Sequence, residues 1–168
     1  MNKINFENLP STATPLNASN LNLLQTNVEN AINQLSESIM VTLSENQSNS
    51  GNSEIIVGFD TTSFNKGTTF TKQNDGGIKC NEACDIEINA VLRFGYSNAS
   101  TKETYIYKNA IELVNTSLQQ ATANTQTISS YLLSVSANDV IYLKGKTNSE
   151  DASAFIHEGT YLSIKRIG

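Results

Sequence analysis

Hydrophobic residues between Pro15 and Leu43 recur with a helical period. A 3-4-4 spacing keeps one stripe apolar at every position, namely Leu21, Leu24, Val28, Ile32, Leu35, Ile39 and Leu43. A strict heptad repeat from Leu21 would bring Ser38 and Thr42 into the stripe, so an 11-residue repeat of about 3.67 residues per turn fits better. Asn17 is a suitable N-cap. The pattern therefore predicts one amphipathic helix over residues 17–43.

The narrow apolar stripe of this helix needs a partner surface. Packing against the chain's own β-rich part is one alternative. Residues 44–53 (SENQSNSGNS) contain no apolar side chain, however, and their composition predicts a polar, flexible linker. Identical helices around a symmetry axis would bury the stripe without help from the remainder of the chain. We therefore expect an oligomerisation stalk in which the stripe forms the seam of a parallel bundle.

Residues 54–168 alternate between apolar and polar side chains, as β-strands do. In DIEINAVLRF the apolar side chains of one face are Ile86, Ile88, Ala90, Leu92 and Phe94. Turn signals occur in NDGG, at Lys108-Asn109 and at Asn138-Asp139. Roughly eight to ten short strands without a second helix predict an antiparallel sandwich or jelly roll.

Composition limits the partners of the chain. It has 168 residues, a net charge of −5 and only 16% charged residues, which argues against an electrostatic grip on nucleic acid. No apolar run approaches the roughly 20 residues of a membrane span, so no membrane insertion is expected. The N-terminal segment lacks the apolar core of a secretory signal, which predicts synthesis in the cytoplasm. The Asn-, Ser- and Thr-rich surface suits a protein that works outside a cell or on a particle.

Residues that carry catalytic or metal chemistry are sparse. Cys80 and Cys84 have the spacing C-x3-C, and His157 is the single histidine, so a four-ligand zinc site has too few ligands. The two cysteines are read as small strand residues, with a local disulfide as the alternative. Glu150 and Asp151 lack the ligand spacing of a calcium loop and are read as solvated. We expect no enzyme, no catalytic or metal-binding residue and no cofactor.

The part of the chain after residue 53 resembles the jelly rolls of the tumour-necrosis-factor and complement-globular-head families. The segment YLLSVSANDVIYL resembles their penultimate hairpin, and FIHEGTYLSI, with Gly159 and Leu162, resembles their last strand. DIEINAVLRFGY fits their long alternating strand. Asn138 stands where the family has a turn glycine, and the chain has neither Trp nor a collagen-like stalk. The resemblance covers about residues 54–168 and implies a jelly-roll head that associates in threes.

The first segment, FENLPSTATPLNASNLN, is similar to the N-termini of bacteriophage head-fibre and tail-fibre proteins. This resemblance implies a virion component that attaches through an extended N-terminus to a capsid or baseplate protein. Both resemblances imply a homotrimer. The predicted organisation is an anchor over residues 1–16, a helical coiled-coil stalk over 17–43, a linker over 44–53 and a jelly-roll head over 54–168.

A ligand-binding role would use side chains of the head. Tyr105 and Tyr107 share one face of a strand and suit stacking on a sugar, although packing in the head or at a trimer axis is the alternative. Asn98, Asn124 and Asn148 lie in polar loops without a packing pattern. The sequence therefore predicts a trimeric phage fibre that binds a bacterial surface glycan or protein. The alternatives are a decoration protein without a ligand and an enzyme that trims polysaccharide.

Overall fold

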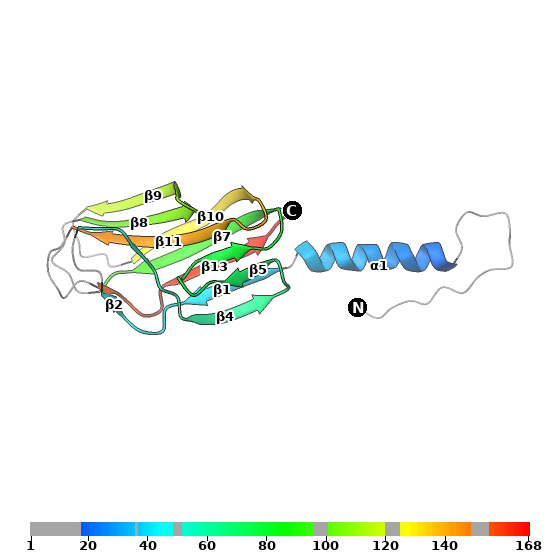
Figure 1. The fold of residues 1–168 in the computed structure, drawn as a ribbon, viewed down its shortest axis with the longest axis horizontal. Helices are drawn as coiled ribbons and strands as arrows, with labels where there is room; N and C mark the ends of the chain where they lie inside the picture. The colour runs from blue at the N-terminus through cyan, green and yellow to red at the C-terminus, as the bar shows by residue number, and fades with distance from the viewer. Residues whose placement is uncertain (1–17, 36, 49–51, 96–100, 120–124, 149–154) are drawn as a thin grey trace.

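The computed structural model describes residues 18–35, 37–48, 52–95, 101–119, 125–148 and 155–168. Within these residues it has one helix, α1 (Ala18–Leu35), followed by a two-layered β-sandwich. Figure 1 shows α1 projecting from one end of the sandwich along the long axis of the molecule, and the C-terminus lies at the same end. A helix of 18 residues is about 27 Å long, so α1 extends well beyond the head.

The first layer is a five-stranded antiparallel sheet. Its strand order is β10 (Thr125–Val135), β7 (Cys84–Arg93), β13 (Tyr161–Arg166), β1 (Ser38–Thr42) and β4 (Thr61–Lys66). β1 is the strand nearest α1 in the chain, yet it pairs on both sides, with β13 and with β4. The segment that follows the helix is therefore an interior strand of the head.

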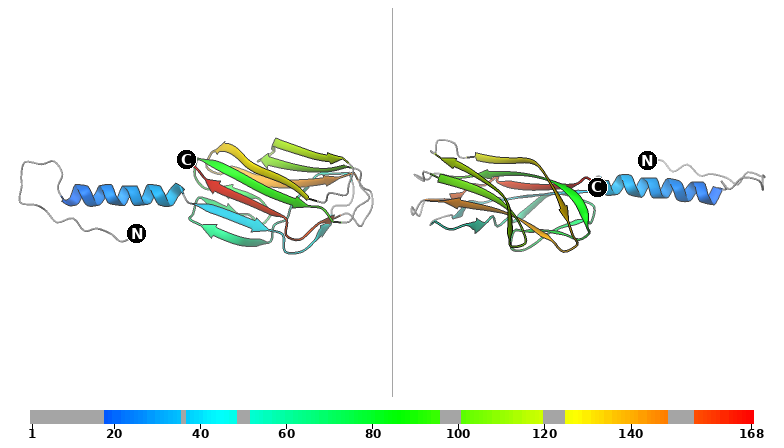
Figure 2. Two further views of the ribbon diagram at one scale, coloured as in Figure 1. Left: turned by 180° about the vertical axis from the view of Figure 1, so that it is seen from behind. Right: turned by 90° about the horizontal axis from the view of Figure 1, so that it is seen from above.

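The second layer is a six-stranded sheet that faces the first (Figure 2). Its order is β5 (Phe70–Lys72), β6 (Ile78–Cys80), β11 (Val140–Thr147), β8 (Thr101–Lys108) and β9 (Ile111–Gln119), and β3 (Ile55–Ile56) also pairs with β11. A two-stranded ribbon joins β2 (Gln47–Ser48) to β12 (Phe155–Ile156). This arrangement confirms the predicted jelly roll.

The core lies between the two sheets and follows the predicted alternation. Ile86, Ile88, Ala90 and Leu92 of β7 are all buried, and so is Phe94 after the strand. The turns that join the strands also match the prediction, because Asn109 and Asn138 adopt positive φ of 55° and 74°. Asparagine tolerates this left-handed conformation better than most residues, which is why Asn138 serves in place of glycine.

The predicted end of the helix is wrong. α1 ends at Leu35 rather than at Leu43, and Ile39 and Leu43 belong to the core of the head, where they are 1% and 5% exposed. Ile39, Val41 and Leu43 alternate with outward-facing Met40 and Thr42, which is the period of a strand. Positions 39 and 43 fit both the helical 3-4-4 spacing and the strand period of two. The fully buried Val41 between them fits the strand period alone.

The predicted linker over residues 44–53 is also wrong in its described part. β2 lies within it, and the Gln47 side chain donates to the carbonyl of Ile56 and accepts from the N–H of Gly58, both at 2.9 Å. Ser44 donates to the carboxylate of Asp60 through its N–H and its hydroxyl group. Polar side chains thus attach this stretch to the head, and the head begins directly after α1.

Replacement of Val41 by alanine should lower the free energy of unfolding of the head by about 2 kcal/mol, because two buried methyl groups are lost and a cavity remains. Urea unfolding followed by circular dichroism measures the change. Met40→Ala, on the outward face of the same strand, is the matched control and should cost less. Equal costs for the two variants would contradict the strand assignment.

Candidate functional site

The apolar stripe of α1 is open to solvent in the single chain. Leu24, Val28 and Ile32 are 57%, 49% and 50% exposed, and Leu21 is half-buried. Leu35 is the last residue of α1. Polar side chains flank the stripe, with Gln25 donating to Glu29 at 3.0 Å, and Leu23, outside the stripe, is 60% exposed. A helix with one exposed apolar stripe has the pattern of a bundle component.

Because α1 is shorter than predicted, fewer of its positions distinguish the 3-4-4 register from the heptad register. Ile39 and Leu43 decided between the two registers in the sequence, and both belong to the head. Within α1, the 3-4-4 and heptad registers share Leu21, Leu24, Val28 and Leu35 and differ only in using Ile32 or Ala31. The 11-residue repeat therefore remains a prediction that depends on one pair of positions.

The junction between α1 and the head is held by Glu37. Its carboxylate accepts from the N–H of Thr69 at 3.0 Å and from the Thr69 hydroxyl group, and its carbonyl accepts from the N–H of Arg166 at 2.9 Å. These contacts attach the chain to the turn before β5 and to β13, two residues after the helix ends. The sequence pattern did not identify Glu37, because nothing nearby in the chain indicates its partners.

The outward face of the six-stranded sheet carries tyrosines within a charged network. Tyr107 donates to Glu54 at 2.8 Å and lies 3.4 Å from a Glu112 oxygen. The Lys144 ammonium lies 3.4 Å from the centre of the Tyr107 ring and 3.4 Å from Glu54. Tyr105 donates to Glu103 at 2.6 Å. The network combines a cation–π contact with charge-assisted hydrogen bonds.

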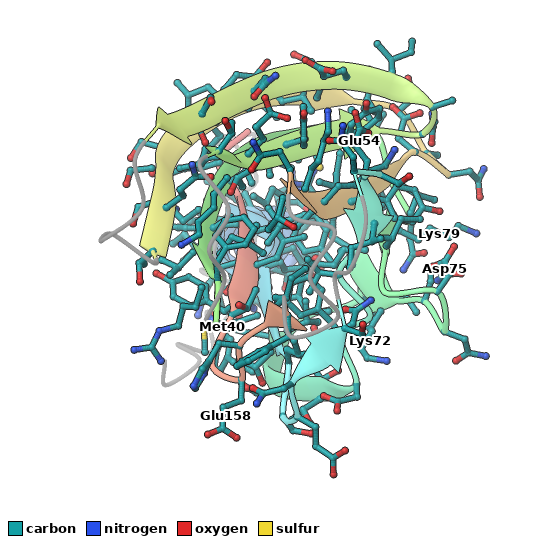
Figure 3. All side chains as sticks on the ribbon, turned by 90° about the vertical axis from the view of Figure 1, so that its left-hand side faces the viewer. Met40, Glu54, Lys72, Asp75, Lys79 and Glu158 are labelled. Atoms are coloured by element: carbon teal, nitrogen blue, oxygen red, sulfur yellow. The ribbon has the colours of Figure 1, made fainter. Side chains whose placement is uncertain are left out.

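This face continues along β11 toward the turn before β6. Tyr142 donates to Asp75 at 2.9 Å. Figure 3 views the sandwich from the end opposite α1, with Glu54, Asp75 and Lys79 on the side of the six-stranded sheet and Met40 on the other side. The hydroxyl groups of Tyr107 and Tyr142 thus donate to carboxylates of other segments, whereas that of Tyr105 donates to Glu103 of its own strand.

The network raises the pKa values of its tyrosines. The hydrogen bond to Glu54, followed by burial, raises the pKa of Tyr107 to about 12. Burial and the Glu103 carboxylate raise the pKa of Tyr105, and burial and Asp75 raise that of Tyr142. Each neutral hydroxyl group donates to a carboxylate, which favours the protonated form.

The predicted ligand residues fall into different environments. Tyr105 and Tyr107 share a face as predicted, with ring centroids 6.3 Å apart. Tyr105 is only 4% exposed, however, so its ring is not open to a ligand, whereas Tyr107 is half-buried. Asn148 is exposed and accepts from the N–H of Thr101 at 3.0 Å, closing the end of the β8–β11 pair. Asn98 and Asn124 lie outside the described residues.

The strands next to the predicted loops end together. Thr101 pairs with Gln119, Lys102 pairs with Thr147, and Thr125 pairs with Arg93. These strand ends lie at the end of the sandwich that is farthest from α1 (Figure 1). A stalk formed by α1 would therefore present this end outward.

Other candidate chemistry stays unsupported in the described part of the chain. No group of three or more His, Cys, Asp or Glu side chains there is placed to hold a metal ion, and no helix there is long and apolar enough to span a membrane. Both cysteines are free thiols, and burial raises the pKa of Cys80 to about 12. The His157 ring lies beside the Glu158 carbonyl, with Nδ1 at 2.7 Å. Glu150 and Asp151 are outside the described residues.

Solved structures share this fold. The PRD1 vertex protein P5 superposes with a TM-score of 0.65 at 13% identity, covering 80% of this chain and 99% of that one. Murine APRIL gives 0.62 at 12% identity, with 77% and 98% covered. Eiger TNF from S. frugiperda gives 0.57 at 8% identity, with 80% and 92% covered. The head is thus a jelly roll of the tumour-necrosis-factor type. No protein-family model and no curated protein matches the sequence.

Tyrosinate absorbance should show that Tyr107 ionises near pH 12, as a difference between the parent chain and Tyr107→Phe. Because this native pKa exceeds the unfolded value of about 10, the contribution of Tyr107 to stability is present below pH 10 and is lost as the pH rises toward 12. Glu54→Gln should move the pKa back toward 10, since an amide carries no charge. Glu112→Gln should have a smaller effect, and the reverse order would contradict the assigned contacts.

Proposed function

We propose that this chain is a structural fibre protein of a bacteriophage virion, in which a homotrimer presents jelly-roll heads on a short helical stalk. The exposed stripe of Leu24, Val28 and Ile32 on a helix that projects from the head carries the proposal. The fold shared with the PRD1 vertex protein P5 supports it, because a vertex protein is a virion component.

Association of identical helices is the simplest way to cover the stripe. Figures 1 and 2 show α1 standing away from both sheets, so the head does not cover its length. A parallel bundle would bring the stripes of neighbouring chains together and remove about half of each large apolar side chain from water. Three copies are favoured because jelly rolls that resemble this head associate in threes. In this arrangement the helical stalk is residues 18–35.

The N-terminal segment, residues 1–16, is proposed to attach the trimer to a capsid or baseplate protein of the virion. Its resemblance to the N-termini of phage fibre proteins supports this role. Pro10 and Pro15 disfavour a continuous helix through the segment, which suits an extended peptide docked on another protein.

The head is proposed to bind a glycan or protein on the bacterial surface with the end that faces away from the stalk. The strand ends at Thr101, Gln119, Thr125 and Thr147 meet there, and the intervening segments are rich in Asn, Ser, Thr and Gln. Such side chains both donate to and accept from sugar hydroxyl groups. Three heads per fibre and many fibres per particle would multiply a weak contact.

A decoration protein without a ligand is the second candidate function. The tyrosine network favours it to a degree, because Tyr105 is buried and the hydroxyl groups of Tyr105 and Tyr107 are occupied by carboxylates of the same chain. Binding of labelled protein to bacterial cells separates the two functions. Among the residues that the structure describes, no arrangement supports an enzyme that trims polysaccharide. Release of reducing ends from cell-wall glycans would be the measurement in favour of such an activity.

Val28→Asp should weaken self-association by several kcal/mol per assembly, because an unpaired charge would enter a desolvated seam. Light scattering and sedimentation measure the change, and the parent chain should have about three times the mass of 18.3 kDa. Asn30→Asp adds the same charge on the opposite side of α1 and is the matched control. Equal trimer masses for the parent, Val28→Asp and Asn30→Asp would contradict a contribution of α1 to trimer formation.

The register is tested by one further pair of variants. In the 3-4-4 register, Ile32→Asp should be much more damaging to the trimer than Ala31→Asp. The heptad register places Ala31 in the seam and predicts the reverse. Sedimentation equilibrium of the two variants at the same concentration distinguishes the registers, and folding of the head is followed by circular dichroism.

Alanine replacements in the segments that join β7 to β8, β9 to β10 and β11 to β12 should reduce binding of the labelled fibre to host cells at least tenfold in one set, about 1.4 kcal/mol. Lys165→Ala, on the outward face of β13 toward the stalk, is the control and should bind as the parent does. If the parent binds no bacterium in a panel, the decoration function is favoured. If all three sets bind like the parent, the site does not lie at this end.

A further inference from the structure

The end of the sandwich farthest from α1 carries an outward-facing arginine and histidine on neighbouring segments. Phe94, directly after β7, forms an antiparallel bridge with Ile156 of β12, and both side chains are buried in the core. Because side chains alternate along a strand, the preceding Arg93 and the following His157 face outward. They lie opposite each other across the bridge, and the N–H of His157 donates to the Arg93 carbonyl at 2.7 Å. Figure 3 looks onto this end and shows Glu158, the residue after His157, on the side of the five-stranded sheet.

Two glycines beside this pair make room for larger side chains. A Cβ atom at Gly95 would clash with the Phe155 ring, so the ring lies against the bare backbone of Gly95. Gly159 has a φ of 76°, and a Cβ atom there would lie 2.9 Å from Nη1 of Arg93, so the guanidinium group lies beside its backbone. The centroids of the Phe155 and His157 rings are 6.0 Å apart. Arg93, Phe155 and His157 therefore form one outward-facing surface, which we call the shelf.

A buried hydroxyl group fixes the backbone of the shelf. Thr160 is fully buried, and its hydroxyl group accepts from the N–H of Arg93 at 3.0 Å and donates to the His157 carbonyl at 2.9 Å. The His157 ring is oriented by its Nδ1, which lies 2.7 Å from the Glu158 carbonyl. Because a carbonyl oxygen only accepts, Nδ1 carries the proton, and Nε2 of the neutral ring is an acceptor. In the described part of the chain, this Nε2 atom has no hydrogen-bond donor.

The positive charge of Arg93 is not neutralised by a carboxylate of the described residues. The side chain is exposed. The ion pairs among those residues use Lys108, Lys144, Lys146 and Arg166 instead. A guanidinium group binds a carboxylate through two parallel hydrogen bonds, and its planar fork suits this geometry better than an ammonium group does. An exposed guanidinium group that is held beside an aromatic ring is therefore arranged for an anionic ligand.

We propose that the shelf binds one acidic sugar unit of the bacterial surface, a pyranose ring that carries a carboxylate. Arg93 donates to the carboxylate, Nε2 of His157 accepts from a sugar hydroxyl group, and the Phe155 ring covers the apolar face of the sugar. A linear polyol phosphate has the charge but no flat apolar face for this ring. The inference rests on the proposed attachment function and gives its ligand a chemical class. The shelf lies between two of the segments proposed for attachment, those that join β7 to β8 and β11 to β12.

Binding of the full chain to immobilised saccharides tests the ligand class. The probes are polymers that contain glucuronic acid, galacturonic acid or sialic acid, and the same polymers after reduction of their carboxylates to alcohols. At least one acidic polymer should be bound about tenfold more tightly than its reduced form. Binding to none of the acidic polymers, equal binding of each acidic polymer and its reduced form, or a preference for poly(glycerol phosphate) would overturn the proposal.

Variants of the shelf test its position. Arg93→Ala should weaken binding of the acidic polymer about tenfold or more, because a hydrogen bond between two charged groups is lost. Arg93→Lys keeps the charge without the planar fork and should recover only part of the loss. Phe155→Leu should also weaken binding, since a flat ring is replaced by a branched side chain. Lys165→Ala removes one positive charge from the outward face of β13 toward the stalk, and this matched control should bind as the parent does.

Host-cell binding and light scattering separate a failure of the shelf from a failure of the proposed function. If Arg93→Ala binds host cells as the parent does, or if Lys165→Ala loses as much, the shelf is not the site and the attachment function stands. If Arg93→Ala lowers the mass of the assembly, Arg93 belongs to a contact between chains, which also contradicts the shelf. If the parent binds neither cells nor any saccharide, both the shelf and the attachment function are wrong.

Discussion

The insertion of β1 between β13 and β4 is the constraint on which the other parts of the structure depend. Ile39, Val41 and Leu43 face the core from this strand, and both of its edges are hydrogen-bonded. Because these residues are required by the sheet, the helix must end before them. Glu37 then fixes the junction through Thr69 and Arg166. The length of α1 and its position at one end of the head both follow from this strand.

Local patterns were sufficient to predict the fold of the head but not its boundary. The alternation in β7 is unambiguous, because one complete face of the strand is buried. The turns at Asn109 and Asn138 were predictable because few residues tolerate positive φ. Ile39 and Leu43, by contrast, fit a helix and a strand equally well. Only pairing with β13, more than a hundred residues away, decides the assignment, and a local pattern contains no such information.

The candidate surfaces were less predictable for the same reason. The sequence identifies Tyr105 and Tyr107 as neighbours on one face, but Glu54, Lys144 and Glu112, the partners of Tyr107, come from three other strands or segments. Tyr105 is 4% exposed, so of the two rings only that of Tyr107 is partly open to solvent.

The position of β1 also determines how the molecule would bear mechanical load. In a fibre held at its N-terminus and engaged at the far end of the head, tension enters the head through α1 and passes directly into β1. The force is then directed along a strand that is hydrogen-bonded on both sides and runs roughly parallel to the long axis. Such loading shears the ladders with β13 and β4 as a whole, since their bonds lie across the strand. A strand peeled from an edge would lose its bonds one after another, so this topology suits a tether.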